Sequence, residues 1–136
     1  MASHLNEELI AILNDCIATT EGCIDACQVL TEKCSTTDIV ECGEQLGECQ
    51  EACQNTIDSC HAAIEECSDH MGICDEDDCE EKCLAVIEAA EECIESCEEL
   101  LEACDAEYED CMDTSFKTMT ACENCAQACN DCLQED

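Results

Sequence analysis

The spacing of the cysteines constrains the fold of this chain more than any other feature. Cys accounts for 20 of the 136 residues, and both of the first two groups of cysteines begin with steps of seven, four and seven residues. At about 100° of rotation per residue, such steps return to nearly the same side of a helix. The cysteines therefore form narrow stripes along helices, and their period is not that of strands. Four groups follow one another: residues 16–34, 42–74, 79–111 and 122–132.

Three breaks separate the predicted helices. Residues 35–38 offer N-cap side chains, and Glu41 lies three residues after the last of them, as in a capping box. Gly72 is a helix-ending residue, and residues 113–115 form a third, weaker break. The absence of Pro leaves the windows between the breaks uninterrupted. We predict a single domain over residues 1–136, with helices at about 4–34, 38–70, 76–111 and 115–133.

The cysteines on consecutive helices match symmetrically about these breaks, which are centred on residues 38, 73 and 113. Antiparallel helices joined by a short loop bring such matched residues to the same height. The pattern predicts an all-α fold, an up-down-up-down four-helix bundle with a cysteine-lined core. The expected layers are Cys34, Cys42, Cys104 and Cys122; Cys27, Cys49, Cys97 and Cys129; Cys23, Cys53, Cys93 and Cys132; Cys16 and Cys60 facing Val86; and Cys67 and Cys79 facing Leu9.

The composition requires that these cysteines form most of the interior. Leu, Ile, Val and Phe together supply only 23 of 136 residues, a content that with high charge is typical of disorder. Buried Cys behaves as a small hydrophobic residue and can replace the missing aliphatic side chains. Leu5, Leu9 and Ile12 extend the first stripe, so one end of the core is expected to be partly aliphatic.

The charge of the chain excludes several classes of partner. Asp and Glu number 37 against three Lys and Arg, giving a formal charge of −34. Nucleic acids and anionic membranes carry the same sign, so neither is an expected partner. No apolar run approaches the ~20 residues of a membrane span, and the N-terminal residues have no features of an export signal. We expect an acidic, cytoplasmic protein whose carboxylates cover the outside of the bundle.

Metal binding explains the cysteine stripes best. Packing alone explains a few cysteines but not stripes on every helix. A disulfide-stapled structural bundle is the alternative from another class, but the reducing cytosol disfavours it. In addition, Cys-x-x-x-Cys pairs such as Cys23 and Cys27 run parallel on one face, which suits a shared ligand better than a cross-link. The candidate ligands are Cys16, Cys23, Cys27, Cys34, Cys42, Cys49, Cys53, Cys60, Cys67, Cys74, Cys79, Cys83, Cys93, Cys97, Cys104, Cys111, Cys122, Cys125, Cys129 and Cys132.

The ligand type favours Cu(I), in multiple ions. Nearly pure thiolate excludes hard cations, which prefer oxygen. Zinc requires closed sets of four, and each Zn(II) held by four thiolates leaves a −2 site in the core. One Cu(I) per thiolate leaves the core neutral, which avoids the cost of buried charge. A Zn(II)/Cd(II) thiolate reservoir of metallothionein type nevertheless stays an alternative, because the layers offer four-Cys sets.

The last helix contains Cys122-Glu-Asn-Cys125-Ala126-Gln-Ala128-Cys129-Asn-Asp-Cys132. This segment resembles the C-x-x-C-A-x-A-C-x-x-C motif of the copper storage proteins, and three long helices followed by a shorter one are similar to that family over nearly the whole chain. The resemblance implies a four-helix bundle that holds many Cu(I) ions inside by thiolates, assembles as a homotetramer and works in the cytosol. The expected function is Cu(I) storage and detoxification; no sequence feature separates storage from delivery or identifies a donor or acceptor protein.

The remaining candidate residues are few. His70 and Met71 are candidate peripheral ligands at the end of the second helix, and Met112 and Met119 flank the third break. His4 and His61 lie off the stripes and are expected in solvent, whereas Tyr108 is expected to pack. No nucleophile set beside a His and no phosphate-binding loop is present, so we expect no enzyme, and an oxidoreductase is the least favoured alternative.

Overall fold

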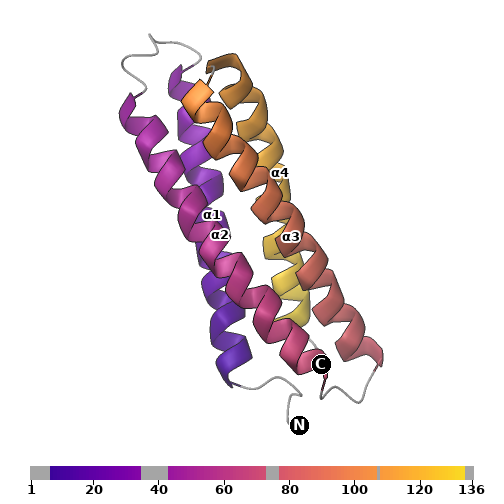
Figure 1. The fold of residues 1–136 in the computed structure, drawn as a ribbon. Coiled ribbons are helices and arrows are strands. Elements are labelled where there is room, and N and C mark those ends of the chain that lie inside the picture. Colours follow the sequence, from indigo (N-terminus) through magenta and orange to yellow (C-terminus); the bar gives the residue numbers. More distant parts are fainter. Residues whose placement is uncertain (1–6, 35–42, 73–76, 107, 134–136) are drawn as a thin grey trace.

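A computed structural model describes residues 7–34, 43–72, 77–106 and 108–133 of this protein. They form four helices, α1 (Glu7–Cys34), α2 (Gly43–Met71), α3 (Asp77–Ala106) and α4 (Tyr108–Leu133), with no strand in these ranges. Consecutive helices run in opposite directions, and α1 begins at the same end of the bundle at which α4 ends (Figure 1). We call this the proximal end and the opposite one the distal end. The predicted all-α, up-down-up-down four-helix bundle is confirmed.

Each helix contacts two neighbours and faces the fourth across the core. The closely packed pairs are α1 with α2, α2 with α3, α3 with α4, and α1 with α4, so the helices form a square in cross-section. The inward side chains on every helix alternate steps of four and three residues, which is the heptad spacing of a left-handed bundle. These buried stripes are Leu9, Leu13, Cys16, Thr20, Cys23, Cys27 and Leu30 on α1; Cys49, Cys53, Thr56, Cys60, Ala63, Cys67 and His70 on α2; Cys83, Val86, Ala90, Cys93, Cys97 and Leu100 on α3; and Ser115, Thr118, Cys122, Cys125, Cys129 and Cys132 on α4.

The interior is built mainly of sulfur. Fourteen cysteines have described side chains, and all of them are buried. The large apolar side chains that are fully buried in the described part are only four leucines and Val86. Leu9 and Leu13 lie at the proximal end, which confirms that this end of the core is partly aliphatic.

Two hydroxyl groups join neighbouring helices through the core. Thr56 Oγ1 on α2 donates to the carbonyl oxygen of Thr19 on α1 at 3.1 Å. Thr118 Oγ1 on α4 donates to the carbonyl oxygen of Ser96 on α3 at 3.0 Å. Because Thr56 and Thr118 are completely buried, these bonds satisfy hydroxyls that would otherwise be costly inside the protein.

The Thr118 bond gives a direct test of the α3–α4 contact. We expect Thr118→Val to destabilise the metal-free, reduced protein by about 1 kcal/mol, because it removes a buried interhelical hydrogen bond without a large change in volume. Guanidinium unfolding followed by circular dichroism measures the effect. The matched control is Thr120→Val, since Thr120 is exposed and bonds only within its own helix, to the Phe116 carbonyl at 3.3 Å. Equal stabilities for the two variants would contradict the proposed role of Thr118.

The helix ends agree with the prediction at one break and differ at another. Gly72 follows the last residue of α2 and donates its N–H to the Asp69 carbonyl at 3.2 Å, as predicted for a helix-ending residue. The break at residues 35–38 lies outside the described residues. The prediction of a break at residues 113–115 is wrong, because this segment lies inside α4, and α3 ends at Ala106 rather than near residue 111.

This difference changes the register of α4 against its neighbours. The prediction placed Cys122 beside Cys104, but its sulfur lies 3.5 Å from that of Cys93. From Cys104 to Cys93 is eleven residues, about three helical turns, so the shift preserves the inward direction of the stripe. Two further contacts between α3 and α4 agree with this register. They are the exposed ion pair of Lys117 with Glu99, at 2.8 Å, and the hydrogen bond from Thr118 to the Ser96 carbonyl.

The register of α1 against α2 is as predicted. The thiols of Cys27 and Cys49 lie 3.5 Å apart, those of Cys23 and Cys53 3.7 Å apart, and those of Cys16 and Cys60 3.9 Å apart. The predicted register of α2 against α3 is wrong by one to two helical turns. Cys93 groups with Cys60 rather than with Cys53.

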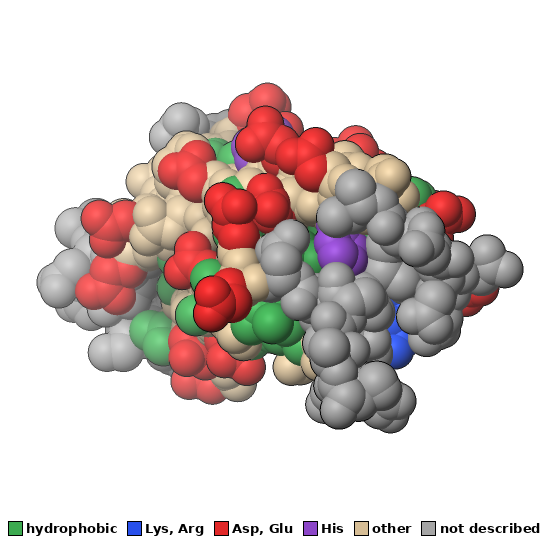
Figure 2. All heavy atoms as spheres, turned by 90° about the horizontal axis from the view of Figure 1, so that it is seen from below, with side chains coloured by type: hydrophobic (Ala, Val, Ile, Leu, Met, Phe, Trp, Pro, Cys, Tyr) green, Lys and Arg blue, Asp and Glu red, His purple; other side chains and the backbone are tan. Residues whose placement is uncertain are grey.

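The described exterior is strongly acidic. Asp and Glu side chains cover much of the surface seen along the bundle axis, with little blue from Lys or Arg (Figure 2). These carboxylates occupy the helix faces opposite the cysteine stripes. Within the described residues, none of the helices has a stretch that is both long and apolar enough to cross a bilayer.

Candidate metal centre

The buried thiols form a continuous sulfur column along the bundle axis. Sulfur–sulfur distances between helices are 3.5 to 3.9 Å, for example between Cys93 and Cys122 and between Cys16 and Cys60. Contacts of this kind connect thiols from all four helices. The sulfur column consists of Cys16, Cys23, Cys27, Cys49, Cys53, Cys60, Cys93, Cys97, Cys122, Cys125 and Cys129.

Within this column, three groups of three thiols are close enough to share one ion. In each group the three sulfur atoms lie within 4.8 Å of one another, and all are buried. Metal–thiolate bonds of about 2.3 Å in a trigonal plane require sulfurs about 4 Å apart, so only small movements are needed. The groups are Cys16, Cys125 and Cys129; Cys23, Cys97 and Cys122; and Cys60, Cys93 and Cys125. The buried core can therefore hold metal ions through thiolates.

Cys125 has a special position because it belongs to two of these groups. Its sulfur lies 3.7 Å from that of Cys16 and 3.9 Å from that of Cys60. Adjacent groups that share a sulfur cannot act as isolated sites, since one thiolate would contact two ions. The geometry thus favours clusters with bridging thiolates.

A second, smaller set of thiols lies toward the proximal end. Cys83 on α3 is hydrogen-bonded to Cys132 on α4 and to Cys67 on α2. All three side chains are fully buried. Apolar inward residues lie between this set and the sulfur column on α2 (Ala63) and on α3 (Val86 and Ala90), whereas on α4 Cys132 directly follows Cys129 of the column in the inward stripe.

The buried thiols share their protons unevenly. Hydrogen bonds from Cys27 and Cys53 lower the pKa of Cys49 to about 5. Hydrogen bonds from Cys129, Cys16 and Cys60 likewise lower the pKa of Cys125 to about 5. The donating thiols change in the opposite sense: the pKa of Cys27 is raised by its hydrogen bonds to Cys23 and Cys49 and by burial. Metal loading must therefore displace protons from the donating thiols.

At the proximal set, Cys83 keeps its proton more tightly than an ordinary thiol. The hydrogen bond from Cys132 lowers its pKa, but the hydrogen bond to Cys67 and burial outweigh this effect, and the pKa rises from 9.0 to about 11. The folded state thus favours the neutral thiol, and its contribution to stability is complete below pH 9.

This pKa predicts an alkaline loss of stability in the metal-free protein. Between pH 9 and pH 11 the unfolded chain loses the Cys83 proton before the folded chain does, so the stabilising contribution of Cys83 falls as the pH rises through this window. We expect the difference in unfolding free energy between the reduced wild type and Cys83→Ser to shrink from pH 9 to pH 11. Guanidinium unfolding at each pH measures the difference, and a constant difference would contradict the assignment.

The candidate peripheral ligands lie near the proximal end. His70 is only 4% exposed and continues the inward stripe of α2, whereas Met71 is half-buried. Neither belongs to a group of three ligands among the described residues. Met119 is half-buried and packs against the core on α4. His4 and the side chains of Tyr108 and Met112 lie outside the described residues.

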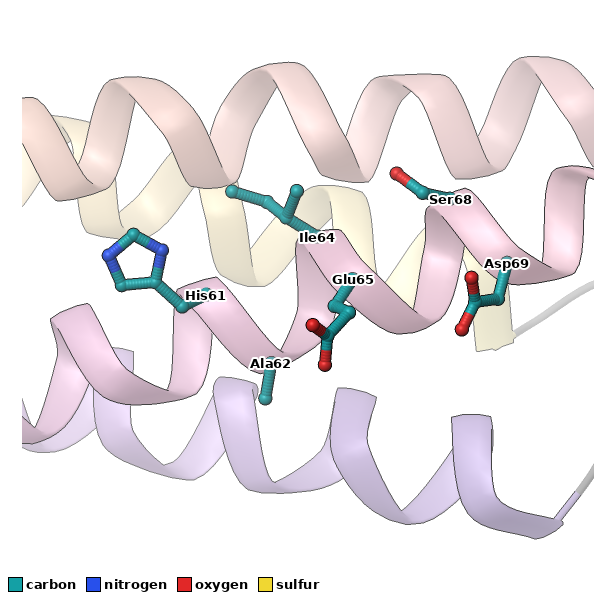
Figure 3. A pocket seen from close by; sticks show the side chains of 6 residues that line it. All are labelled: His61, Ala62, Ile64, Glu65, Ser68 and Asp69. Carbon is teal, nitrogen blue, oxygen red and sulfur yellow. The ribbon is translucent and has the colours of Figure 1, made fainter.

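His61 points away from the sulfur, as expected. It is exposed on the outer face of α2 and lines a shallow depression of about 480 Å³ together with Ile64, Glu65 and Asp69 (Figure 3). No thiol lines this depression, so it is separate from the metal centre.

Of the twenty cysteines predicted as ligands, fourteen have described side chains and six do not. The structure buries all fourteen whose side chains are described, but it groups those of α3 and α4 differently from the predicted layers. Cys16 and Cys60 contact Cys125 rather than facing Val86, and Cys129 lies with Cys16 rather than with Cys27. The side chains of the others lie outside the description: Cys34, Cys42, Cys74, Cys79, Cys104 and Cys111.

The prediction missed the hydroxyl residues of the core. Thr20, Thr56, Ser115 and Thr118 are all fully buried at heptad positions of the cysteine stripes. Thr20 Oγ1 is satisfied within α1 by the carbonyl oxygen of Cys16 at 2.9 Å. Their spacing from the cysteines, always three or four residues, was the available signal.

Comparison with protein-family models, with curated proteins and with solved structures finds no match to this chain.

Proposed function

We propose that this protein stores Cu(I), and thereby detoxifies it, by binding many ions to thiolates inside the bundle. The observation that supports this most strongly is the sulfur column, in which thiols from four helices follow one another without an oxygen or nitrogen ligand in any group of three. Such a purely soft donor set suits Cu(I). A single catalytic or structural site would need only a few of these side chains.

The size of the groups supports Cu(I) over Zn(II). Structural zinc is bound by four ligands in a closed tetrahedron. Among the described residues the compact groups contain three thiols, and none contains four. Cu(I) accepts low coordination numbers, so pairs such as Cys27 and Cys49, at 3.5 Å, are also suitable sites.

Charge supports the same choice. The protein has a formal charge of −34, and additional buried negative charge would be costly. One Cu(I) per thiolate cancels the charge that deprotonation creates, whereas Zn(II) bound by three or four thiolates leaves a net negative site. The similarity of the Cys122–Cys132 segment to the copper storage proteins agrees with this proposal. A cytoplasmic location, a homotetramer and the absence of catalysis belong to the same proposal.

An anaerobic titration tests the proposal. Cu(I) is added to the fully reduced protein in competition with a Cu(I) chelator, and Zn(II) is titrated in parallel. We expect tight uptake that approaches one Cu(I) per cysteine, with release of protons, and weaker uptake as the pH falls. Saturation at one or two Cu(I), together with firm binding of several Zn(II), would overturn the proposal in favour of a zinc reservoir.

A further inference from the structure

The three-thiol groups also fit a ligand that is not a metal cation. Trivalent arsenic forms three bonds to sulfur and keeps a lone pair in the fourth position, so it requires three thiols and no fourth donor. The described core offers groups of this size, with sulfurs within 4.8 Å of one another. Two of the groups draw their thiols from three different helices: Cys23, Cys97 and Cys122, and Cys60, Cys93 and Cys125.

We propose that the sulfur column binds trivalent arsenic as a second class of ligand, with each arsenic atom bonded to the three thiols of one group. In neutral water arsenite is the uncharged molecule As(OH)₃. Its condensation with the neutral form of a group forms three As–S bonds and breaks three As–O and three S–H bonds, and the thiol protons leave with the hydroxides as three water molecules. A thiol that is already ionised, such as Cys125, takes up one proton from solution in the same overall reaction. Arsenic stays trivalent, so no oxidant or reductant is needed.

The surroundings of the groups suit this product. Every thiol concerned is fully buried, and a buried site is least costly when it is neutral. The arsenic trithiolate is neutral, and so is the arsenite that enters, which means that the acidic exterior neither attracts nor repels it. Arsenic therefore needs no compensating charge.

The shared thiol sets the stoichiometry of the three groups. Cys125 belongs to two of them, so those two cannot hold an arsenic atom each at the same time. The group of Cys23, Cys97 and Cys122 has no thiol in common with the others. We therefore expect the three groups to take up two arsenic atoms, one in this group and one in a group that contains Cys125.

The experiment adds sodium arsenite to the reduced, full-length protein without oxygen. Intact mass spectrometry counts additions of one arsenic less three hydrogens, and alkylation followed by peptide mapping identifies the protected cysteines. We expect Cys97→Ser to lose one arsenic and the protection of Cys23 and Cys122. Cys125→Ser should also lose one arsenic while Cys23 and Cys122 stay protected, and the control Cys132→Ser should leave that protection unchanged.

Two results would overturn the proposal. One is protection of Cys23 and Cys122 that persists in Cys97→Ser, and the other is protection spread over the cysteines without regard to the groups. A proton count separates this proposal from copper storage, because arsenite binding releases water and no acid, whereas Cu(I) loading of thiols releases protons. A failed copper titration leaves the arsenite result standing, and the reverse also holds.

Discussion

Loading the reduced protein with Cu(I) is expected to raise its stability more than any substitution lowers it. A ligand that binds only the folded state adds about 4 kcal/mol per site when its free concentration is a thousand times the dissociation constant. Several sites multiply this gain. We expect the metal-free protein to unfold at low guanidinium concentration and the loaded protein to resist far higher concentrations.

The composition of the core explains why the metal-free state is weak. Cysteines occupy more than half of the buried inward positions of the four helices. Each cysteine buries less apolar surface than a leucine would. The exterior adds repulsion among carboxylates, which an exposed ion pair such as that of Lys117 with Glu99 does little to offset.

Circular dichroism in guanidinium, recorded without oxygen on metal-free and Cu(I)-loaded protein, measures the difference. Guanidinium chloride screens surface charge equally in both samples, so the comparison isolates the contribution of the core. Removal of Cu(I) by an excess of chelator should restore the weak state. Equal unfolding midpoints with and without Cu(I) would show that the thiols contribute nothing to stability through metal.

The sequence was sufficient to predict that there are four helices, which faces point inward and the register of α1 against α2, but not the bounds of α3 and α4. The register prediction succeeded because Cys16, Cys23 and Cys27 on α1 are as far along the chain from the α1–α2 connection as their partner cysteines on α2 are. Each of these pairs is in contact in the structure. Burial of a stripe depends only on its period, and the period was clear.

The register of α4 could not be obtained from the cysteines alone. A heptad stripe moved by eleven residues still points inward, so Cys122 fits beside either Cys104 or Cys93. The position of the connection decides between them, and residues 113–115 offered plausible capping side chains in the wrong place. Ser115 and Thr118 continue the buried α4 stripe ahead of Cys122, and the interhelical bond from Thr118 to the Ser96 carbonyl belongs to the observed register.

That register determines which thiols meet, and so it determines the second large effect. We expect Cys125→Ser to lower the Cu(I) capacity by more than one ion, because this thiol belongs to two of the three groups. The matched control is Cys49→Ser, at the distal end of the sulfur column, where the sulfur of Cys49 contacts that of Cys27 at 3.5 Å. Its loss should cost one ion at most.

Anaerobic titration against a chelator, with metal and thiol contents measured on the same sample, gives the capacity of each variant. Each substitution places a hydroxyl of similar size in the core. Circular dichroism of the metal-free variants therefore checks that both remain helical. A larger loss at Cys125 than at Cys49 means that ions share thiolates, so the groups fill as one cluster. Equal losses would mean that every thiolate holds its own ion, and the sulfur column would then be a row of independent sites rather than a bridged cluster.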